Sequence, residues 1–122
     1  MKYVRMSIEK ESPEQLGYER IKNNLTETSV RDRNIKDLGL VLDDILLPYG
    51  DHLGDPRLRD IIAQQSGVDD SNDVLVTAGA ASALFLIASS LLEPGDKMIV
   101  ARPNYGTNIE TPRAIGADIS YL

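Results

Sequence analysis

The chain has 122 residues, of which 42% are hydrophobic, and 13 Lys and Arg against 19 Asp and Glu give it a net charge of −6. This acidic balance, with no basic stripe to offset it, argues against nucleic acid and membranes as partners. The absence of cysteine excludes disulfides, thiolate metal sites and a Cys nucleophile. No signal-peptide pattern opens the sequence, and its longest apolar stretch is too short for a membrane span. We therefore expect a cytoplasmic globular protein without a metal site.

Residues 1–37 are highly charged and predict an N-terminal helical arm, or small-domain element, that docks on something larger. A helix is expected to begin near Ser12-Pro13-Glu14, because Ser12 suits the N-cap and Pro13 the first turn. Its thin apolar stripe would consist of Leu16, Ile21 and Leu25.

Residues 43–47 predict one helical turn, which Pro48 ends. The turn-forming residues 49–56 follow, and Asp55 and Pro56 are the cap and first position of a helix that runs to about Gln65. Its apolar face would be formed by Leu58, Ile61 and Ile62, and Gly67 would end it.

From residue 73 onward the pattern alternates between strands and helices. Strands are expected at residues 73–77, 97–101 and 118–122, with helices at residues 80–92 and from residue 107 to Ala114. Strands joined by helical crossovers indicate an α/β fold with a parallel sheet. The sequence ends within the third of these strands, which indicates a fragment.

The stretch from Val74 to Ala81 predicts a strand, a tight turn and the start of a helix. Free N–H groups and the helix dipole make such a helix start attractive to anions, and the small residues from Gly79 to Ala81 would let a phosphate approach the backbone. The other interpretation is a close-packed turn with no ligand. The sequence has neither the G-x-G-x-x-G pattern nor the Walker lysine, so dinucleotide and nucleoside-triphosphate sites lose support.

Four elements in a fixed order carry a more specific signal. They are Tyr49 with Gly54 and Leu58-Arg59, then Thr77-x-Gly79-Ala80-x-x-Ala83, then Pro94-Gly95-Asp96, and then Pro103-Asn104-Tyr105. This order and spacing resembles class I/II aminotransferases, which are fold type I enzymes that depend on pyridoxal 5′-phosphate (PLP). The resemblance covers residues 38–122 and departs at Ser82, where the family often has Glu or Gln.

The resemblance implies that residues 38–122 are the N-terminal part of a PLP-binding large domain. It also implies that Gly79, Ala80 and Ala81 contact the cofactor phosphate and that Tyr105 stacks on the pyridine ring. Tyr49 would reach the partner's phosphate across a homodimer, and Gly39 would lie near the substrate carboxylate. For Tyr105 and Tyr49 the other interpretation is an ordinary loop or turn aromatic.

The remaining polar residues have simpler interpretations. His52 is predicted to be a loop residue. Arg57 and Arg59 are predicted to form a solvated helix face and a structural ion pair. Lys97 opens a strand and is not a Schiff-base lysine.

The resemblance also shows which catalytic residues are missing. The family's Schiff-base lysine, the acid that pairs with the pyridine nitrogen and the substrate-binding arginine lie far downstream of the Pro103-Asn104-Tyr105 motif. None of the five lysines, at positions 2, 10, 22, 36 and 97, stands in a matching context. We therefore expect no catalytic residue in this chain, no transamination by it alone and at most weak PLP binding.

In the family's sheet, later sequence fills the gap between the first of these strands and the next two. We therefore expect either an oligomer or a repacked sheet in which residues 74–77 pair with residues 97–101. Three functions remain open: a piece of an aminotransferase or of another PLP enzyme such as a C–S lyase or decarboxylase, a non-catalytic binding or oligomerisation module, and an unrelated α/β binding protein.

Overall fold

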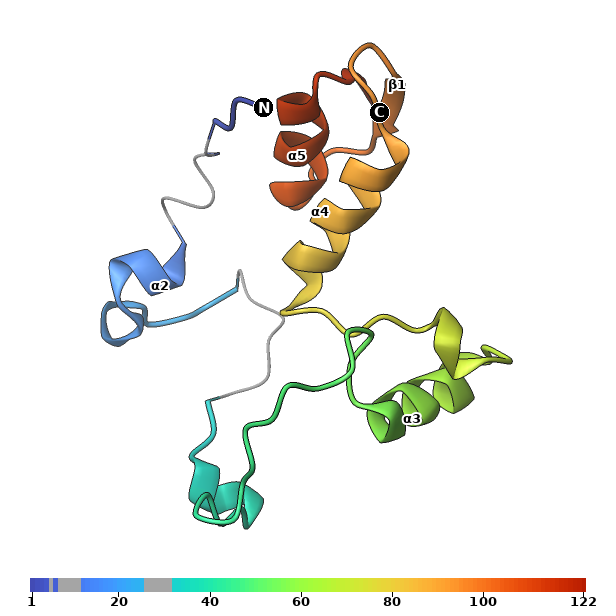
Figure 1. Ribbon diagram of the computed structural model, residues 1–122. Coiled ribbons are helices and arrows are strands. Elements are labelled where there is room, and N and C mark those ends of the chain that lie inside the picture. Colours follow the sequence, from blue (N-terminus) through green and yellow to red (C-terminus); the bar gives the residue numbers. More distant parts are fainter. Residues whose placement is uncertain (5, 7–11, 26–31) are drawn as a thin grey trace. The chain divides into compact units, whose positions relative to one another are not determined.

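The computed structural model describes residues 1–4, 6, 12–25 and 32–122 (Figure 1). Its contacts divide the chain into two compact units. Unit 1 combines Met1–Asn24 with Thr77–Leu122, and unit 2 is Leu25–Val76. The predicted division of the chain into an arm of residues 1–37 and the N-terminal part of a large domain at residues 38–122 is not tested by these contacts and stays a prediction.

Unit 1 contains a mixed α/β element. Helix α4 (Ala80–Leu91) leads through a turn to strand β1 (Lys97–Val100), and helix α5 (Thr107–Ile115) connects β1 to strand β2 (Asp118–Tyr121). The two strands pair in parallel, with Lys97 opposite Asp118 and Val100 opposite Tyr121. These helices and strands lie where the sequence predicted them, because Gly79, the Pro94-Gly95 turn and Gly116 mark their ends.

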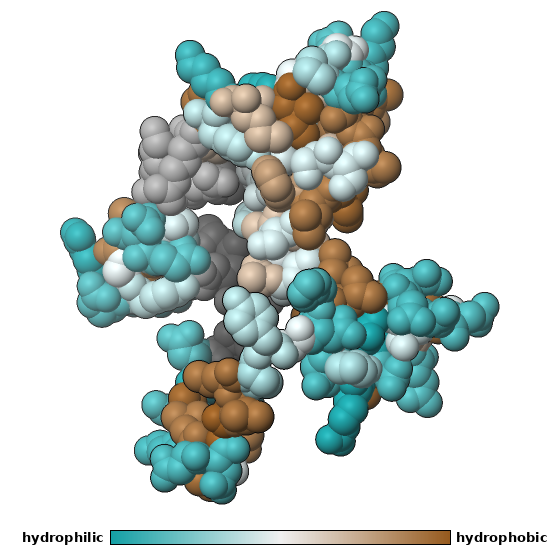
Figure 2. All heavy atoms as spheres, viewed as in Figure 1, coloured by the Kyte–Doolittle hydropathy of each residue, from teal (hydrophilic) through white to brown (hydrophobic). Residues whose placement is uncertain are grey.

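The core of unit 1 lies where α5 covers the two strands. Its fully buried side chains are Ile109 and Pro112, and Val100, Thr111 and Ala114 are also buried. Helix α4 packs along α5 but has no fully buried residue. Figure 2 shows apolar surface over α4, whose Ile87 and Leu91 are more than half exposed.

The arm differs from its prediction. Its helix α2 (Pro13–Leu16) has only four residues, and Gly17 with a φ of +88° ends it before the 3₁₀ turn η1 (Tyr18–Arg20). Pro13 does occupy the first helical position, but Ser12 makes no side-chain cap bond. The predicted stripe through Ile21 and Leu25 therefore does not form, since both residues follow the helix.

Unit 2 is organised around helix α3 (Pro56–Ser66). Asp55 caps it by accepting a hydrogen bond from the Leu58 N–H at 3.0 Å, and Gly67 ends it with a φ of +68°. Both ends agree with the prediction. The predicted apolar face does not, because Leu58 and Ile61 are exposed while Arg59 and Ala63 are the buried residues of the helix.

Two further segments of unit 2 are less regular than predicted. Residues 43 and 44 form a turn held by the bond from the Ile45 N–H to the Leu42 carbonyl, and residues 45–47 have no regular structure, so the predicted helical turn does not form. The 3₁₀ turn η2 (Ile35–Leu38) precedes it, and η3 (Ser71–Asp73) follows α3.

The predicted strand at residues 73–77 does not form. Asp73 belongs to η3, and from Val74 to Thr77 the chain has no strand partner. The bond of this segment to a residue distant in the sequence runs from the Val76 N–H to the Leu53 carbonyl at 2.8 Å, and its other bonds are local, to Ser71 and Gly79. Of the two expected alternatives, the repacked sheet in which residues 74–77 pair with residues 97–101 is therefore wrong, because the described sheet consists of β1 and β2. The other alternative, an oligomer, stays a prediction.

Candidate functional site

The turn that begins α4 is held by bonds between its own residues. The Gly79 N–H donates to the Thr77 carbonyl at 2.8 Å, and the Thr77 hydroxyl donates to the Gly79 carbonyl at 2.9 Å. Gly79 has a φ of +87°, a conformation that residues with a Cβ rarely adopt. The glycine is therefore required by the backbone, and the space where a Cβ would stand is open.

The first turn of α4 presents backbone N–H groups outward. A helix leaves its first N–H groups without intrahelical acceptors, here including those of Ala80 and Ala81. Gly79 has no side chain to cap them, and the Ser82 hydroxyl donates instead to the Ala78 carbonyl at 3.0 Å. These groups and the positive end of the helix dipole are suited to bind an anion.

Tyr105 lies in the loop between β1 and α5, and its side chain is 56% exposed. Asn104 organises this loop: its Oδ1 accepts the Tyr105 N–H at 2.8 Å and the Asn108 side-chain amide at 2.7 Å. Its Nδ2 donates to the Ala101 carbonyl at 3.1 Å. The tyrosine ring is thus exposed to solvent, while hydrogen bonds to Asn104 hold the backbone that carries it.

Connectivity brings the α4 turn and the Tyr105 loop toward one end of unit 1. Helices α4 and α5 lie side by side and both begin at their lower ends in Figure 1. The loop of Tyr105 follows the carboxyl end of β1, which is the edge where ligands bind in open α/β sheets. The predicted residues Gly79, Ala80, Ala81 and Tyr105 therefore belong to the same compact unit.

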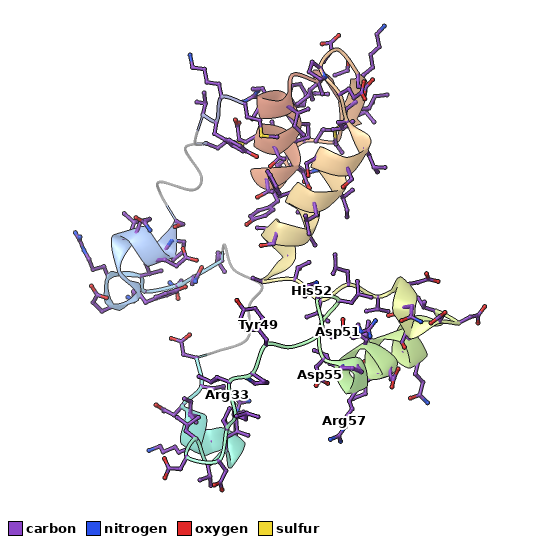
Figure 3. All side chains as sticks on the ribbon, viewed as in Figure 1. Arg33, Tyr49, Asp51, His52, Asp55 and Arg57 are labelled. Atoms are coloured by element: carbon purple, nitrogen blue, oxygen red, sulfur yellow. The ribbon has the colours of Figure 1, made fainter. Side chains whose placement is uncertain are left out.

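The other two predicted site residues belong to unit 2. Tyr49 is fully exposed on the chain that leads to α3, where Figure 3 shows it with Asp51 and His52. Gly39 ends η2 with a φ of +65°, so the backbone again explains the glycine. Their proposed contacts with a phosphate and a substrate stay predictions.

Arg59 differs from the predicted solvated face. It is 5% exposed, its Nη1 donates to the Ser71 carbonyl at 3.2 Å, and its Nη2 lies 3.6 Å from Asp51 Oδ2. The predicted ion pair is therefore present on a buried side chain. Arg57 is exposed as expected and extends away from α3 in Figure 3.

Sequence reasoning missed a charged cluster beside β2. The Arg102 guanidinium lies 3.3 Å from the centroid of the Tyr121 ring, and Arg113 Nη2 donates to the Tyr121 hydroxyl at 3.0 Å. Arg113 also pairs with the buried Glu110. Desolvation acts to raise the pKa of Tyr121, but the two guanidinium groups outweigh it and lower that pKa. The hydrogen bond to Tyr121 likewise raises the pKa of Arg113. Only the i,i+3 spacing of Glu110 and Arg113 signals any of this in the sequence.

A cavity of about 250 Å³ is lined by residues of α4, β1 and α5. Its lining is almost entirely apolar and includes Leu84, Leu91, Met98 and Pro112. Because Thr107 and Asn108 are the polar residues in this lining and it offers an anion few partners, the α4 turn remains the better phosphate site. The described part of the chain contains no cluster of His, Asp or Glu suited to a metal ion, and none of its helices has the length and hydropathy of a membrane span.

Comparisons with known proteins connect this geometry to a family. The chain is 34% identical over 73 residues to histidinol-phosphate aminotransferase of Staphylococcus epidermidis, and 41% identical over 76 residues to the arginine–pyruvate transaminase AruH of Pseudomonas aeruginosa. Over about 60% of its length, the chain is similar to class I aminotransferases. No family model matches it.

A solved aminotransferase supports the same relation in three dimensions. The α-aminoadipate aminotransferase LysN of Thermus thermophilus, complexed with N-(5′-phosphopyridoxyl)-L-leucine, matches 62% of the chain with a TM-score of 0.58 and 29% sequence identity. The match covers 19% of that protein, and the chain spans about a fifth of the length of the two relatives above. The α/β fold and the relation to PLP-dependent aminotransferases are thereby confirmed for this part.

Proposed function

We propose that the chain supplies the phosphate-binding turn and the ring-stacking tyrosine of a PLP-dependent aminotransferase. Such an enzyme transfers an amino group between an amino acid and a 2-oxo acid. The observation that carries the proposal is the glycine turn at Gly79, which leaves the first N–H groups of α4 without a side-chain cap. It is supported by the similarity of about 60% of the chain to aminotransferases. The transaminase function of the relatives above favours this reaction over lyase or decarboxylase chemistry.

The residues present fit the cofactor. The phosphate would be held at the N–H groups of Ala80 and Ala81, where no side chain competes for them. The exposed ring of Tyr105 offers a flat apolar face for the pyridine ring. When bound, PLP supplies a ring that withdraws electrons from the substrate's amino-bearing carbon.

In this proposal the chain's own residues bind and orient but move no proton. Gly79 gives the turn its shape, the α4 N-terminus would hold the phosphate, and Tyr105 would stack on the pyridine ring. None of the four described lysines lies within these elements: Lys97 opens β1, and Lys2, Lys22 and Lys36 are exposed. Lys10 lies outside the described residues.

We further propose that the protein acts as a homo-oligomer, in which Tyr49 of one copy approaches the phosphate site of another. Its full exposure in unit 2 is compatible with that role. The exposed apolar residues of α4 supply a reason for association, because large exposed apolar patches mark interaction sites.

The test is a titration of the isotope-labelled chain with N-(5′-phosphopyridoxyl)-L-leucine. Its reduced linkage cannot react with lysine amines, so binding is not confused with random labelling. We expect the amide signals of Ala80 and Ala81 to shift most, with the ring signals of Tyr105 shifting in parallel.

The matched variants are Gly79→Ala and Gly50→Ala. Gly79→Ala forces a Cβ into a φ of +87°, so it is expected to weaken binding, whereas Gly50 has ordinary backbone and open space around it. Shifts spread over surface lysines, with the α4 turn unaffected, would contradict the proposal.

A further inference from the structure

The loop that carries Tyr105 connects β1 to α5 and is held by side-chain hydrogen bonds of Asn104. The side chain of Asn104 links three places at once: the end of β1 through the Ala101 carbonyl, the Tyr105 N–H, and the first turn of α5 through Asn108. All three distances lie between 2.7 and 3.1 Å. Each polar atom of the Asn104 side chain therefore has a partner.

The backbone of Tyr105 is held on both sides as a result. Its N–H donates a hydrogen bond to Asn104 Oδ1 at 2.8 Å, and its carbonyl accepts one from the Asn108 backbone N–H at 3.0 Å. Two bonds on one residue restrict its φ and ψ, and these angles set the direction of the Cα–Cβ bond. The ring is 56% exposed, so packing alone does not hold it.

An exposed aromatic ring on a fixed backbone is preorganised for a planar ligand. A ring that must first be ordered loses affinity, because binding then costs conformational entropy. Supporting hydrogen bonds around a binding residue remove that cost and hold its geometry.

We propose that Asn104, together with Asn108, is a positioning residue that sets the direction of the Tyr105 ring for stacking on a phosphopyridoxyl ligand. The inference rests on the proposed function for the identity of the ligand. The hydrogen-bonded loop itself does not depend on that function.

The first measurement is amide hydrogen exchange of the free chain by NMR. Asn104→Ala is expected to speed exchange of the Tyr105 N–H by roughly fivefold or more, the size of one lost hydrogen bond. Asn104→Asp keeps an acceptor for that N–H and is expected to restore most of the protection. Asn72→Ala is the matched control, because Asn72 is exposed in η3 of the other unit. Unchanged exchange of the Tyr105 N–H in Asn104→Ala would overturn the proposal.

The second measurement is the Kd of N-(5′-phosphopyridoxyl)-L-leucine in a double-mutant cycle. Tyr105→Phe keeps the ring and is expected to bind like the original chain, while Asn104→Ala is expected to bind several-fold more weakly. In a Tyr105→Leu background, Asn104→Ala should have no further effect, because a positioning residue acts only through the ring. Equal losses in both backgrounds would show that Asn104 acts independently, and that result also overturns the proposal.

The two measurements separate the proposal from the function on which it rests. If the original chain binds no phosphopyridoxyl ligand, the proposed function and the ligand named here are both overturned, while the exchange data still decide whether Asn104 holds the Tyr105 backbone. If Asn104→Ala loses the β1 and α5 signals altogether, the milder Asn108→Ala, which removes a single side-chain donor, is put through the same cycle.

Discussion

At the scale of single residues, the contacts of Tyr121 change how it titrates. Desolvation opposes its ionisation, but the guanidinium groups of Arg102 and Arg113 favour the phenolate and lower its pKa. A lowered pKa in the folded state means that the phenolate is more favourable there than in the unfolded chain. The contribution to stability therefore appears as the pH rises through the folded pKa, and it is complete above the ordinary value of 10.0.

We predict that the ring signals of Tyr121 titrate below the ordinary value of 10.0 and that Arg113→Gln moves this titration upward. NMR titration of the ring carbons measures both. Arg57→Gln, which removes an exposed cation in the other unit, serves as the control. A Tyr121 titration that Arg113→Gln leaves in place would contradict this account.

At the scale of elements, Arg59 joins α3 to two loops. Its guanidinium bonds the Ser71 carbonyl at the start of η3 and pairs with Asp51 in the loop before the helix. We predict that Arg59→Ala destabilises unit 2 by about 2 kcal/mol, since it removes a charge-assisted bond and leaves a gap. Asp51 is itself 43% exposed, so the loss of its partner adds little.

Amide exchange of the α3 residues measures this change within unit 2. Arg57→Ala is the control on the same helix, and its exposed side chain predicts a change within about 0.5 kcal/mol. Equal effects of the two substitutions would show that the buried contacts of Arg59 contribute nothing.

The same scale shows what the sequence can and cannot predict. Helix α3 was predictable because Asp55, Pro56 and Gly67 act within a few residues of the ends that they fix. The strand at residues 73–77 was not, because a strand depends on a distant neighbour, and this segment finds one bond to Leu53. The candidate site shows the same contrast. The shape of the Gly79 turn could be predicted from the residues next to it, whereas the burial of Arg59 depends on contacts with η3 and with the loop at Asp51.

At the scale of the whole molecule, charge is unevenly distributed. The chain has a net charge of −6, yet no charged residue occurs from Val74 to Leu92. This uncharged stretch includes all of α4, with Ile87 and Leu91 exposed. Two acidic chains that meet through this stretch bring no like-charged side chains of it together, which lowers the electrostatic cost of contact there.

We therefore predict that the chain self-associates through α4, and that Ile87→Lys with Leu91→Lys shifts it toward monomer in sedimentation experiments. Ser90→Lys adds a charge to the same helix at an exposed polar position and is expected to have a smaller effect. A chain that is monomeric at all concentrations would count against association.

The chain alone should also fail to transaminate, because none of its five lysines stands in the family's catalytic context. Turnover by chain purified free of host aminotransferases, measured as 2-oxo acid formed from an amino acid donor with added PLP, checks this expectation. Sustained turnover that is lost in Lys97→Arg would reveal a catalytic lysine that the alignment of motifs does not recognise.

The bonds around Asn104 have a consequence for inheritance. Among the described residues, the hydrogen bonds of Asn104 and of the Tyr105 backbone join residues between Ala101 and Asn108, which eight consecutive codons encode. The same loop is tied to the end of β2 by the bond from the Arg102 N–H to the Leu122 carbonyl. Recombination within the gene for such a protein would therefore keep the bonds around Tyr105 together, and a graft of this loop onto a new scaffold would also need an acceptor for the Arg102 N–H.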